Sequence, residues 1–311
     1  MQFVQTISFA NFTRLILFLG IATATFSLGC SGSTTAATTA TAASTTSVYP
    51  AAYQAARWTA NTTVSFPSTC SMTYTTTGVP VVHDTYYLAP AANGQTVVAT
   101  TPISKMSMAL INYSASSLKG NTATVNICPT AATASTPTGF GAIGFLISGI
   151  ALFNAYEATG QVALSDNVSY TFKDSNGVAQ TASFLDGCSS HQAGGATGAT
   201  WHYHGLPICV TSTIDTSTGP SHLLGFALDG YPIYGGRDIT GTVITTSQLD
   251  ACNGITSPTP EFATATYHYV LPIGVTGAQS SIGCYHGTVN AKVAAAARKL
   301  ACNMPGMAMG M

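Results

Sequence analysis

Charged residues are scarce in this chain of 311 residues. Only 6% of them are Asp, Glu, Lys or Arg, and the formal net charge at pH 7 is −1. The chain therefore has no basic field to attract nucleic acid or an anionic membrane surface, and we expect no nucleic-acid partner. Its solubility must rest on Thr, Ser, Asn and Gly, and such surfaces suit exported proteins that are rich in β-strands.

Several signatures of catalysis and of cysteine chemistry are absent as well. The sequence contains no Gly-x-Ser-x-Gly, no His-Glu-x-x-His and no phosphate-binding loop. It also lacks Cys-x-x-Cys, which disfavours a zinc ribbon or a thioredoxin-like site. The sequence therefore names no catalytic residue and leaves open whether the protein is an enzyme.

The first residues predict a targeting segment. An apolar stretch starts at Leu15 and ends in Ser27-Leu28-Gly29-Cys30, which is typical of an export signal over residues 1–29. Because the last four residues resemble a bacterial lipobox, we expect Cys30 to become a lipidated N-terminus that anchors the protein to the bilayer of the cell envelope. Residues 30–48, mostly Ser, Thr and Ala, form a tether. An ordinary secretory signal, giving a periplasmic or secreted protein, is the alternative.

Seven cysteines remain after Cys30. In an oxidising compartment such residues usually pair, although sequence alone does not fix the connectivity. We expect Cys70 and Cys128 to tie the N-terminal region together. Pairings among the next four, which are Cys188, Cys209, Cys252 and Cys284, would then brace the histidine strings described below and leave one odd thiol.

The strand signals predict a mainly β fold, α+β at most. Residues 49–138 hold short runs of β-branched and aromatic residues separated by turn residues. Residues 143–153 predict a tight hairpin around Ser148-Gly149, and residues 226–234 repeat this apolar run, glycine turn and apolar return. The N-terminal region is therefore expected to be β-rich, and two similar hairpins are expected beyond it.

The two hairpins belong to a degenerate internal duplication. Each is followed by an Asp-x-Cys and then by an aromatic-histidine string, so residues 139–290 are expected to form one domain of two half-repeats. Such repeats favour half-units that pack around one shared, pseudo-symmetric site. Residues 291–302 are Ala-rich and predict a short C-terminal helix, followed by a Met-rich tail over residues 303–311.

The strings Trp201-His202-Tyr203-His204 and Tyr267-His268-Tyr269-Val270 carry three of the seven histidines. In an extended strand, residues two apart point to the same side, so His202 and His204 form a two-point chelate. Neutral imidazole is the common ligand of zinc, copper and nickel. We expect His202, His204 and His268 to bind a metal, with His191 as the next candidate. The alternative is that these rings pack among aromatic residues and bond to the backbone.

Four further side chains are candidates for direct ligation or for fixing imidazole tautomers, namely Asp186, Asp229, Asp250 and His222. For each aspartate, a carboxylate that caps a turn is the more ordinary interpretation. For His222, a structural role is the more ordinary one.

The order of these motifs resembles that of the YHYH-domain proteins. The resemblance rests on Asp186-Gly187-Cys188, Trp201 to Cys209, Phe226 to Gly235, Leu249 to Gly254, Tyr267-His268-Tyr269 and Ile282 to Tyr285. Trp201 stands where the naming motif has its first Tyr, and Val270 replaces the last His of the second copy. The resemblance implies an exported or surface-associated protein, and it implies no agreed biochemical role.

The tail adds soft donor atoms. It carries Met304, Met307, Met309 and Met311 within eight residues. Thioethers select Cu(I), so methionines at this spacing are typical of exported copper handling, and they favour copper over zinc. A terminus with chance methionines is the alternative.

Taken together, the sequence predicts an exported, surface-anchored protein that binds a transition metal, copper in preference to zinc, through the histidines of its YHYH motif. One alternative is an extracellular metal-dependent hydrolase or oxidase that uses the same histidines. Another is a surface module without metal, whose aromatic side chains line a groove for a glycan or another ligand.

Overall fold

A computed structural model describes residues 48–80, 118–157, 160, 162–165, 169–173, 179–183, 185, 187–193 and 200–294. The expected export signal, Cys30, nearly all of the tether, Asp186 and the Met-rich tail lie outside the described residues. Everything described below belongs to one compact unit within residues 40–311.

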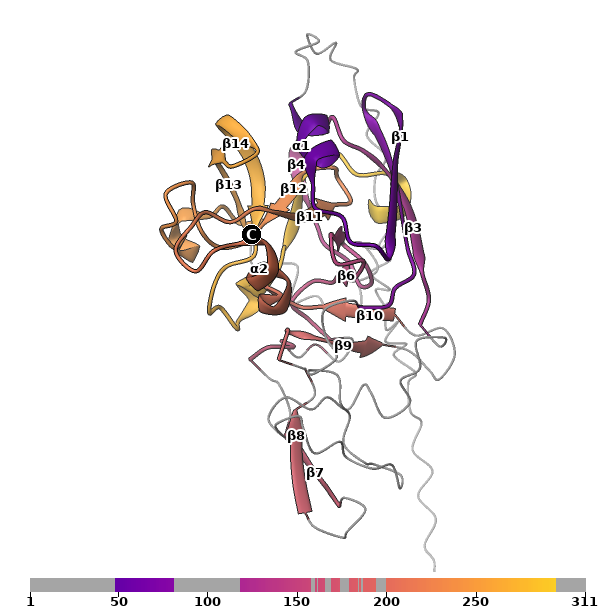
Figure 1. Cartoon of the computed structure of the whole chain (residues 1–311), viewed down its shortest axis with the longest axis vertical. Coiled ribbons are helices and arrows are strands. Elements are labelled where there is room, and N and C mark those ends of the chain that lie inside the picture. Colours follow the sequence, from indigo (N-terminus) through magenta and orange to yellow (C-terminus); the bar gives the residue numbers. More distant parts are fainter. Residues whose placement is uncertain are drawn as a thin grey trace, which may run out of the picture. The chain divides into compact units, whose positions relative to one another are not determined.

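An eight-stranded sheet forms the centre of this unit (Figure 1). Its strands, in spatial order, are β13 (Gly254–Thr259), β14 (Phe262–Val270), β12 (Pro232–Tyr234), β11 (Leu223–Ala227), β5 (Gly144–Leu146), β6 (Ala151–Leu152), β10 (Thr200–Tyr203) and β9 (Ser190–Ala193). The two expected hairpins, β5–β6 and β11–β12, lie side by side in the middle. Their turns contain Gly149 (φ 83°) and Gly230 (φ 90°), in the left-handed region that glycine enters without a steric penalty.

The sheet has an internal two-fold repeat that centres on the antiparallel pair β5–β11. On one side β10 runs parallel to β6 and antiparallel to β9; on the other β14 runs parallel to β12 and antiparallel to β13. Tyr203 pairs with Leu152 of β6, and Tyr269 pairs with Ile233 of β12. The degenerate duplication expected from the sequence is therefore a property of the fold.

Details of the backbone repeat as well. Among the residues described, Ser189 and Asn253 are the two non-glycine residues with positive φ (61° and 66°), and each precedes the outer strand of its half, β9 or β13. After each hairpin the chain turns back through an isolated bridge, Tyr156 with Val162 in one half and Arg237 with Val243 in the other. These matched positions allow residues of one half to be compared with their counterparts in the other.

Smaller sheets and short helices complete the unit, which is mainly β as expected. The strands outside the central sheet are β1 (Thr62–Ser68), β2 (Ser71–Thr76), β3 (Asn121–Asn126), β4 (Ala131–Pro137), β7 (Ser169–Lys173), β8 (Ala179–Ser183) and β15 (Cys284–Gly287). They pair as β1–β2–β3, β15–β4 and β7–β8. The helices are α1 (Tyr49–Ala55), α2 (Ile208–Ile214), η5 (Thr246–Gln248) and η6 (Ala278–Ser280). Residues 291–294 form the start of the expected C-terminal helix.

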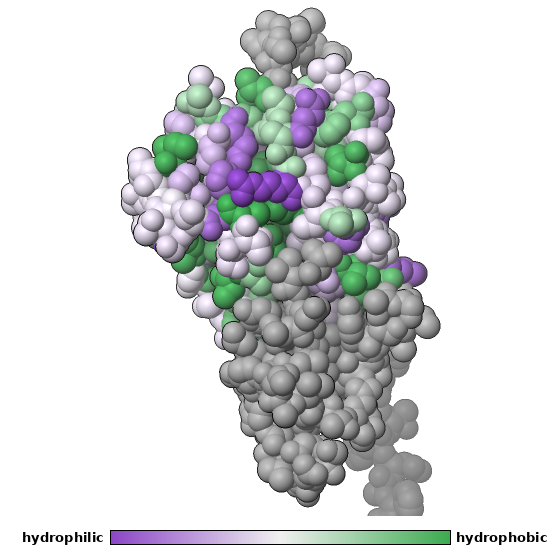
Figure 2. Space-filling model, viewed as in Figure 1, coloured by the Kyte–Doolittle hydropathy of each residue, from purple (hydrophilic) through white to green (hydrophobic). Residues whose placement is uncertain are grey.

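Aromatic residues fill much of the core. Phe226 of β11 contacts Tyr53, Tyr74 and Phe145 with ring centroids 5.3–6.4 Å apart. The hydroxyl of Tyr53 donates to the carbonyl of Gly230, which ties α1 to the turn of the second hairpin. On the face shown in Figure 2, most described residues are pale, which is the hydropathy of Ser, Thr and Gly and agrees with the scarcity of charge.

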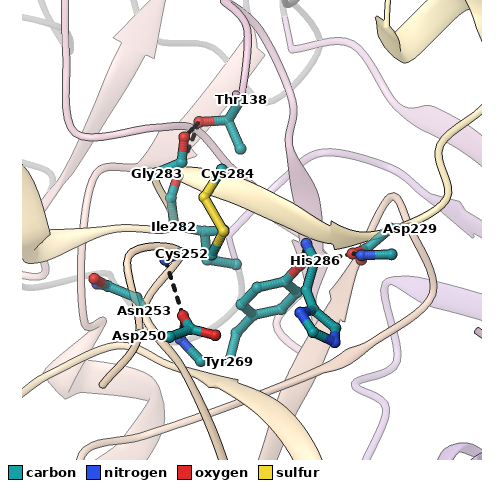
Figure 3. The surroundings of a disulfide bond; sticks show 12 residues. Thr138, Asp229, Asp250, Cys252, Asn253, Tyr269, Ile282, Gly283, Cys284 and His286 are labelled. Carbon is teal, nitrogen blue, oxygen red and sulfur yellow. Dashed lines mark hydrogen bonds between the residues drawn. A yellow bond between two sulfur atoms is a disulfide. The ribbon is translucent and has the colours of Figure 1, made fainter. Parts of the chain in front are cut away.

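Three disulfides are formed: Cys70–Cys128, Cys188–Cys209 and Cys252–Cys284. The first confirms the expected pair, and the other two confirm that the remaining four cysteines pair among themselves. The last two occupy matched places, because Cys188 and Cys252 each lead into the outer strand of one half. Figure 3 shows the Cys252–Cys284 bond beside Asp250 and Asn253. The partners are separated by 21 to 58 positions in the sequence. In a loop-closure model each crosslink lowers the entropy of the unfolded chain, which stabilises the fold by roughly 3–4 kcal/mol per bond.

Candidate metal centre

Four side chains from one half of the sheet meet at a single point: Glu157, His191, His202 and His204. One ligand atom from each lies within 4.8 Å of the others. His191 lies on β9 and His202 on β10, where the two are register partners. His204 directly follows β10, two residues after His202, so both rings project from the same side of that strand. Glu157 comes from the loop after the first hairpin.

The ligand atoms are close enough to share one ion. Nε2 of His204 lies 3.0 Å from Nε2 of His202 and 3.1 Å from Nε2 of His191. Oε1 of Glu157 lies 2.8 Å from Nε2 of His191 and 3.0 Å from Nε2 of His204. Neither contact has the geometry of a hydrogen bond, so Oε1 is a buried polar atom without a hydrogen-bond partner. The four ligand atoms therefore surround a space of the size that one ion occupies.

Backbone carbonyls fix the orientation of two of the rings. Nδ1 of His202 lies 3.1 Å from the carbonyl oxygen of Thr200, and Nδ1 of His204 lies 2.7 Å from that of Asn154. A carbonyl only accepts, so each Nδ1 carries the proton and each Nε2 is left with a free lone pair. This is how proteins hold metal-binding imidazoles in the required tautomer.

The electrostatics favour a neutral His202 and an ionised Glu157. Burial lowers the pKa of His202 well below its ordinary value, and repulsion from His191 and His204 lowers it further. Burial raises the pKa of Glu157, but the contacts with His191 and His204 and the positive charge that those rings can carry outweigh it, so the net pKa is lowered. Neutral imidazole and carboxylate are the protonation states that bind a metal.

The histidine side of the cluster is buried and packed against neighbouring residues. The three histidines are only 1–2% exposed, whereas the side chain of Glu157 is 21% exposed. The ring of Phe153 stacks on that of His202 with centroids 3.9 Å apart. From the loop containing η6, the hydroxyl of Ser280 donates to the carbonyl of His204. The second half of the sheet thus braces a site that the first half builds.

The donor set fits a transition metal. Three imidazoles and one carboxylate give the four ligands of a tetrahedral site, whose donor atoms lie about 3.3 Å apart when each is about 2.0–2.1 Å from the ion. Four of the contacts between donor atoms are 2.8–3.1 Å long, slightly shorter than this spacing, and all the donor atoms lie within 4.8 Å of one another. The set holds no sulfur, and imidazole with carboxylate suits Zn²⁺ and Cu²⁺.

His268 does not belong to this group. It lies on β14, and four strands separate β14 from β10. Five spacings of about 4.8 Å place the two strands roughly 24 Å apart, too far for a common ion. The shared site expected between the two half-repeats is therefore replaced by a site within one half.

The position of His268 is nevertheless the counterpart of His202. Its Nδ1 lies 2.9 Å from the carbonyl of Thr266, two residues before it, as Nδ1 of His202 does with Thr200. Tyr234 contacts its ring from the place that Phe153 takes in the first half. The strand pairings match Ile255 with His191 and Val270 with His204. Two of the ligands are thus aliphatic in the second half.

The other expected candidates lie elsewhere. Asp229 is buried and accepts hydrogen bonds from the hydroxyl of Tyr269 (2.6 Å) and from the amide of Gly287 (2.8 Å); Figure 3 shows Tyr269 beside it. Asp250 accepts from the amides of Cys252 and Gly254, which is the turn-capping role considered for the aspartates. His222 contacts Glu261 at 3.0 Å. Asp186 lies outside the described residues.

Most of the aromatic side chains considered for a ligand groove are in the core. Five of them, Trp201, Tyr203, Tyr231, Tyr234 and Tyr269, are at most 5% exposed. Their rings contact protein, and Tyr267 stacks on His286 with centroids 3.8 Å apart. These faces are therefore not available for stacking on a sugar.

Glu157 is the ligand that sequence reasoning did not place at the histidines. The signal that would have found it is the repeat itself. Gly160 donates its amide to the carbonyl of Glu157 and has φ 88°, and Gly241 does the same to Asp238 with φ 84°. An acid followed by a glycine three residues on, after each hairpin, marks the same loop in both halves.

Residues 122–243 match the family model described as YHYH protein. All four clustered residues lie inside the match, and His268 lies outside it. No curated protein and no solved structure matches the chain.

Proposed function

We propose that this chain, whose residues 122–243 match the YHYH family, is an exported protein that binds one transition-metal ion. The ligands would be Glu157, His191, His202 and His204. The observation that carries the proposal is a cluster of three imidazole nitrogens and one buried Oε1, all within 4.8 Å of one another, in which Oε1 lacks a hydrogen-bond partner. Left without a cation, opposed lone pairs 3.0 Å apart would repel one another unless a proton lay between them. A divalent ion satisfies all four donors at once.

The chemistry expected from this arrangement is binding with little reorganisation. The carbonyls of Thr200 and Asn154 already hold two rings in the metal-binding tautomer, and Phe153 packs against His202. Affinity should fall as protons compete for the imidazoles at low pH. Bound metal would supply a positive charge that neutralises the carboxylate in this buried place.

We propose copper as the metal in preference to zinc. Three imidazoles and a carboxylate bind Cu²⁺ and Zn²⁺ alike, so the preference rests on the methionines at the C-terminus, Met304, Met307, Met309 and Met311. Their thioethers would capture or deliver Cu(I), and the folded site would hold the ion. Deletion of residues 303–311 should then weaken uptake of Cu(I) and leave Zn²⁺ binding unchanged.

A metal-dependent hydrolase or oxidase is the second candidate function. One observation favours it: the side chain of Glu157 is partly exposed, although its Oε1 is buried, whereas the three histidines are buried throughout. Catalysis needs a coordination position that substrate or water can enter. No matching observation favours a glycan-binding module, because most of the aromatic faces are buried.

We also propose that the protein is exported and lipid-anchored through Cys30, with a periplasmic or secreted form as the alternative. Three disulfides support export, because such bonds persist in oxidising compartments. Among the residues described, no helix combines the length and apolar character that a membrane span requires. Mass spectrometry of the protein from its host would find an acylated Cys30, or a different mature N-terminus.

Elemental analysis tests the metal proposal. The purified chain should contain, or take up, about one copper or zinc ion, and the His202→Ala/His204→Ala double variant should contain none. His222→Ala is the matched control, because His222 contacts a carboxylate but lies outside the cluster, and it should keep the full content. A wild-type protein that remains empty after incubation with Cu(I), Cu²⁺ and Zn²⁺ would contradict the proposal.

A further inference from the structure

The four clustered side chains are not held alike. His191 and His202 sit on paired strands, and His204 continues the second of these, so the three rings form a tripod on the sheet. Glu157 comes from a loop instead. Its side chain is 21% exposed, whereas those of His191 and His204 are 3% and 1% exposed. Glu157 is thus the member of the cluster whose side chain extends to the surface, although its Oε1, which faces the histidines, is buried.

The second half of the sheet serves as an internal comparison for this loop. There the loop after the hairpin closes with the same hydrogen bonds, from Gly241 to Asp238 and from Ile244 to Gly236, as from Gly160 to Glu157 and from Ala163 to Ala155 in the first half. Its acid, Asp238, accepts from the amides of Thr240 and Thr242 and takes no part in a metal cluster.

The backbone bonds that the two loops share thus form in the second half although its acid bonds within the loop and belongs to no metal cluster. The backbone hydrogen bonds from Gly160 to Glu157 and from Ala163 to Ala155 close the loop of Glu157. Its fold therefore does not depend on a bond between the carboxylate and a metal. Withdrawal of Glu157 would free one coordination position and disturb neither the tripod nor the loop.

We infer that Glu157 is the displaceable ligand of the site, and that a single donor atom from outside, such as an anion or an imidazole, enters the coordination position it vacates. This inference rests on the proposed metal site. A site with such a ligand can exchange its ion or admit a substrate, whereas a structural site keeps all its ligands in place. The three histidines retain the ion while the ligand at the fourth coordination position is exchanged. The incoming donor therefore binds before the metal leaves.

The test uses the full chain loaded with Cu²⁺, with azide as the entering donor. Glu157→Ala should keep about one Cu²⁺ per chain. Its rate of copper transfer to a chelator should rise at least tenfold over wild type, and azide should bind at least tenfold more tightly, seen as a copper–azide charge-transfer band. Excess azide should also produce this band in the wild type. Glu261→Ala is the matched control, since this carboxylate also contacts a histidine, and it should change neither property.

The outcomes separate the two proposals. Loss of copper from Glu157→Ala as complete as from His204→Ala would overturn the inference, since the carboxylate would then be an obligatory ligand. Unchanged transfer and azide binding in Glu157→Ala would overturn it as well. A wild type that binds neither Cu²⁺ nor Zn²⁺ would instead contradict the metal site itself. Circular dichroism of each variant, compared with that of the wild type, shows whether the fold is kept.

Discussion

If the two halves of the sheet are copies, the metal site can be rebuilt in the second half. The counterparts of Glu157, His191, His202 and His204 are Asp238, Ile255, His268 and Val270. One imidazole is already present, and its Nδ1 already contacts a carbonyl. The triple variant Asp238→Glu/Ile255→His/Val270→His should therefore bind a second ion, and the metal content should rise from about one to about two per chain.

The cost of this rebuilding follows from burial. Val270 is fully buried and Ile255 is partly buried. Each new imidazole that lacks a partner costs about 1–3 kcal/mol, or about 2–6 kcal/mol for the two. A domain is stable by roughly 5–15 kcal/mol, so the metal-free variant should remain folded but melt at a lower temperature. A bound ion at a hundred times its dissociation constant should restore about 2.7 kcal/mol.

The assay is metal content together with thermal unfolding, with and without Zn²⁺. To assign the new ion to the second half, His202→Ala/His204→Ala is added to the triple variant, which should then bind one ion. Ile255→Leu/Val270→Leu is the control for packing changes without new ligands. A triple variant that is folded, as judged by circular dichroism, and still binds no more metal than the wild type would refute the equivalence of the two halves.

Two further predictions concern residues outside the metal centre. Tyr269→Phe removes the hydroxyl that donates to buried Asp229 at 2.6 Å. The free energy of unfolding, measured by urea titration, should therefore fall by about 2–3 kcal/mol. A loss below about 0.5 kcal/mol would mean that water replaces the bond. Burial lowers the pKa of His268 below 6.5, so below that pH the unfolded chain takes up a proton that the folded chain resists, and stability should fall with falling pH. His268→Gln should flatten this part of the pH–stability curve measured by urea titration, and an unchanged curve would contradict the assignment.

The parts of the fold that follow a local rule could be read from the sequence. Apolar runs around Ser148-Gly149 and Asp229-Gly230 predicted hairpins, because a glycine turn between β-forming runs leaves the chain few alternatives. The repeated order of hairpin, Asp-x-Cys and histidine string predicted the duplication. The sequence indicated that Cys188, Cys209, Cys252 and Cys284 pair among themselves, and the structure adds which of them are partners.

The strand order could not be read in the same way, and it decides which histidines meet. His202 and His204 share one side of a strand by spacing alone, whereas the neighbours of that strand are set by long-range pairing. The two hairpins lie against each other in the middle of the sheet, so the histidine strings are carried to opposite ends (Figure 1). This places His268 apart from the cluster and leaves the fourth ligand position to Glu157, which arrives from a loop 34 residues before His191 in the chain.

X-ray absorption spectroscopy of the metal-loaded full chain tests the central claim most directly. We expect one bound copper or zinc ion with three imidazole nitrogens and one oxygen at about 2.0–2.1 Å, and the loss of one imidazole from its coordination in His191→Ala. A spectrum without imidazole scattering, or one that His191→Ala leaves unchanged while His268→Ala alters it, would contradict the claim.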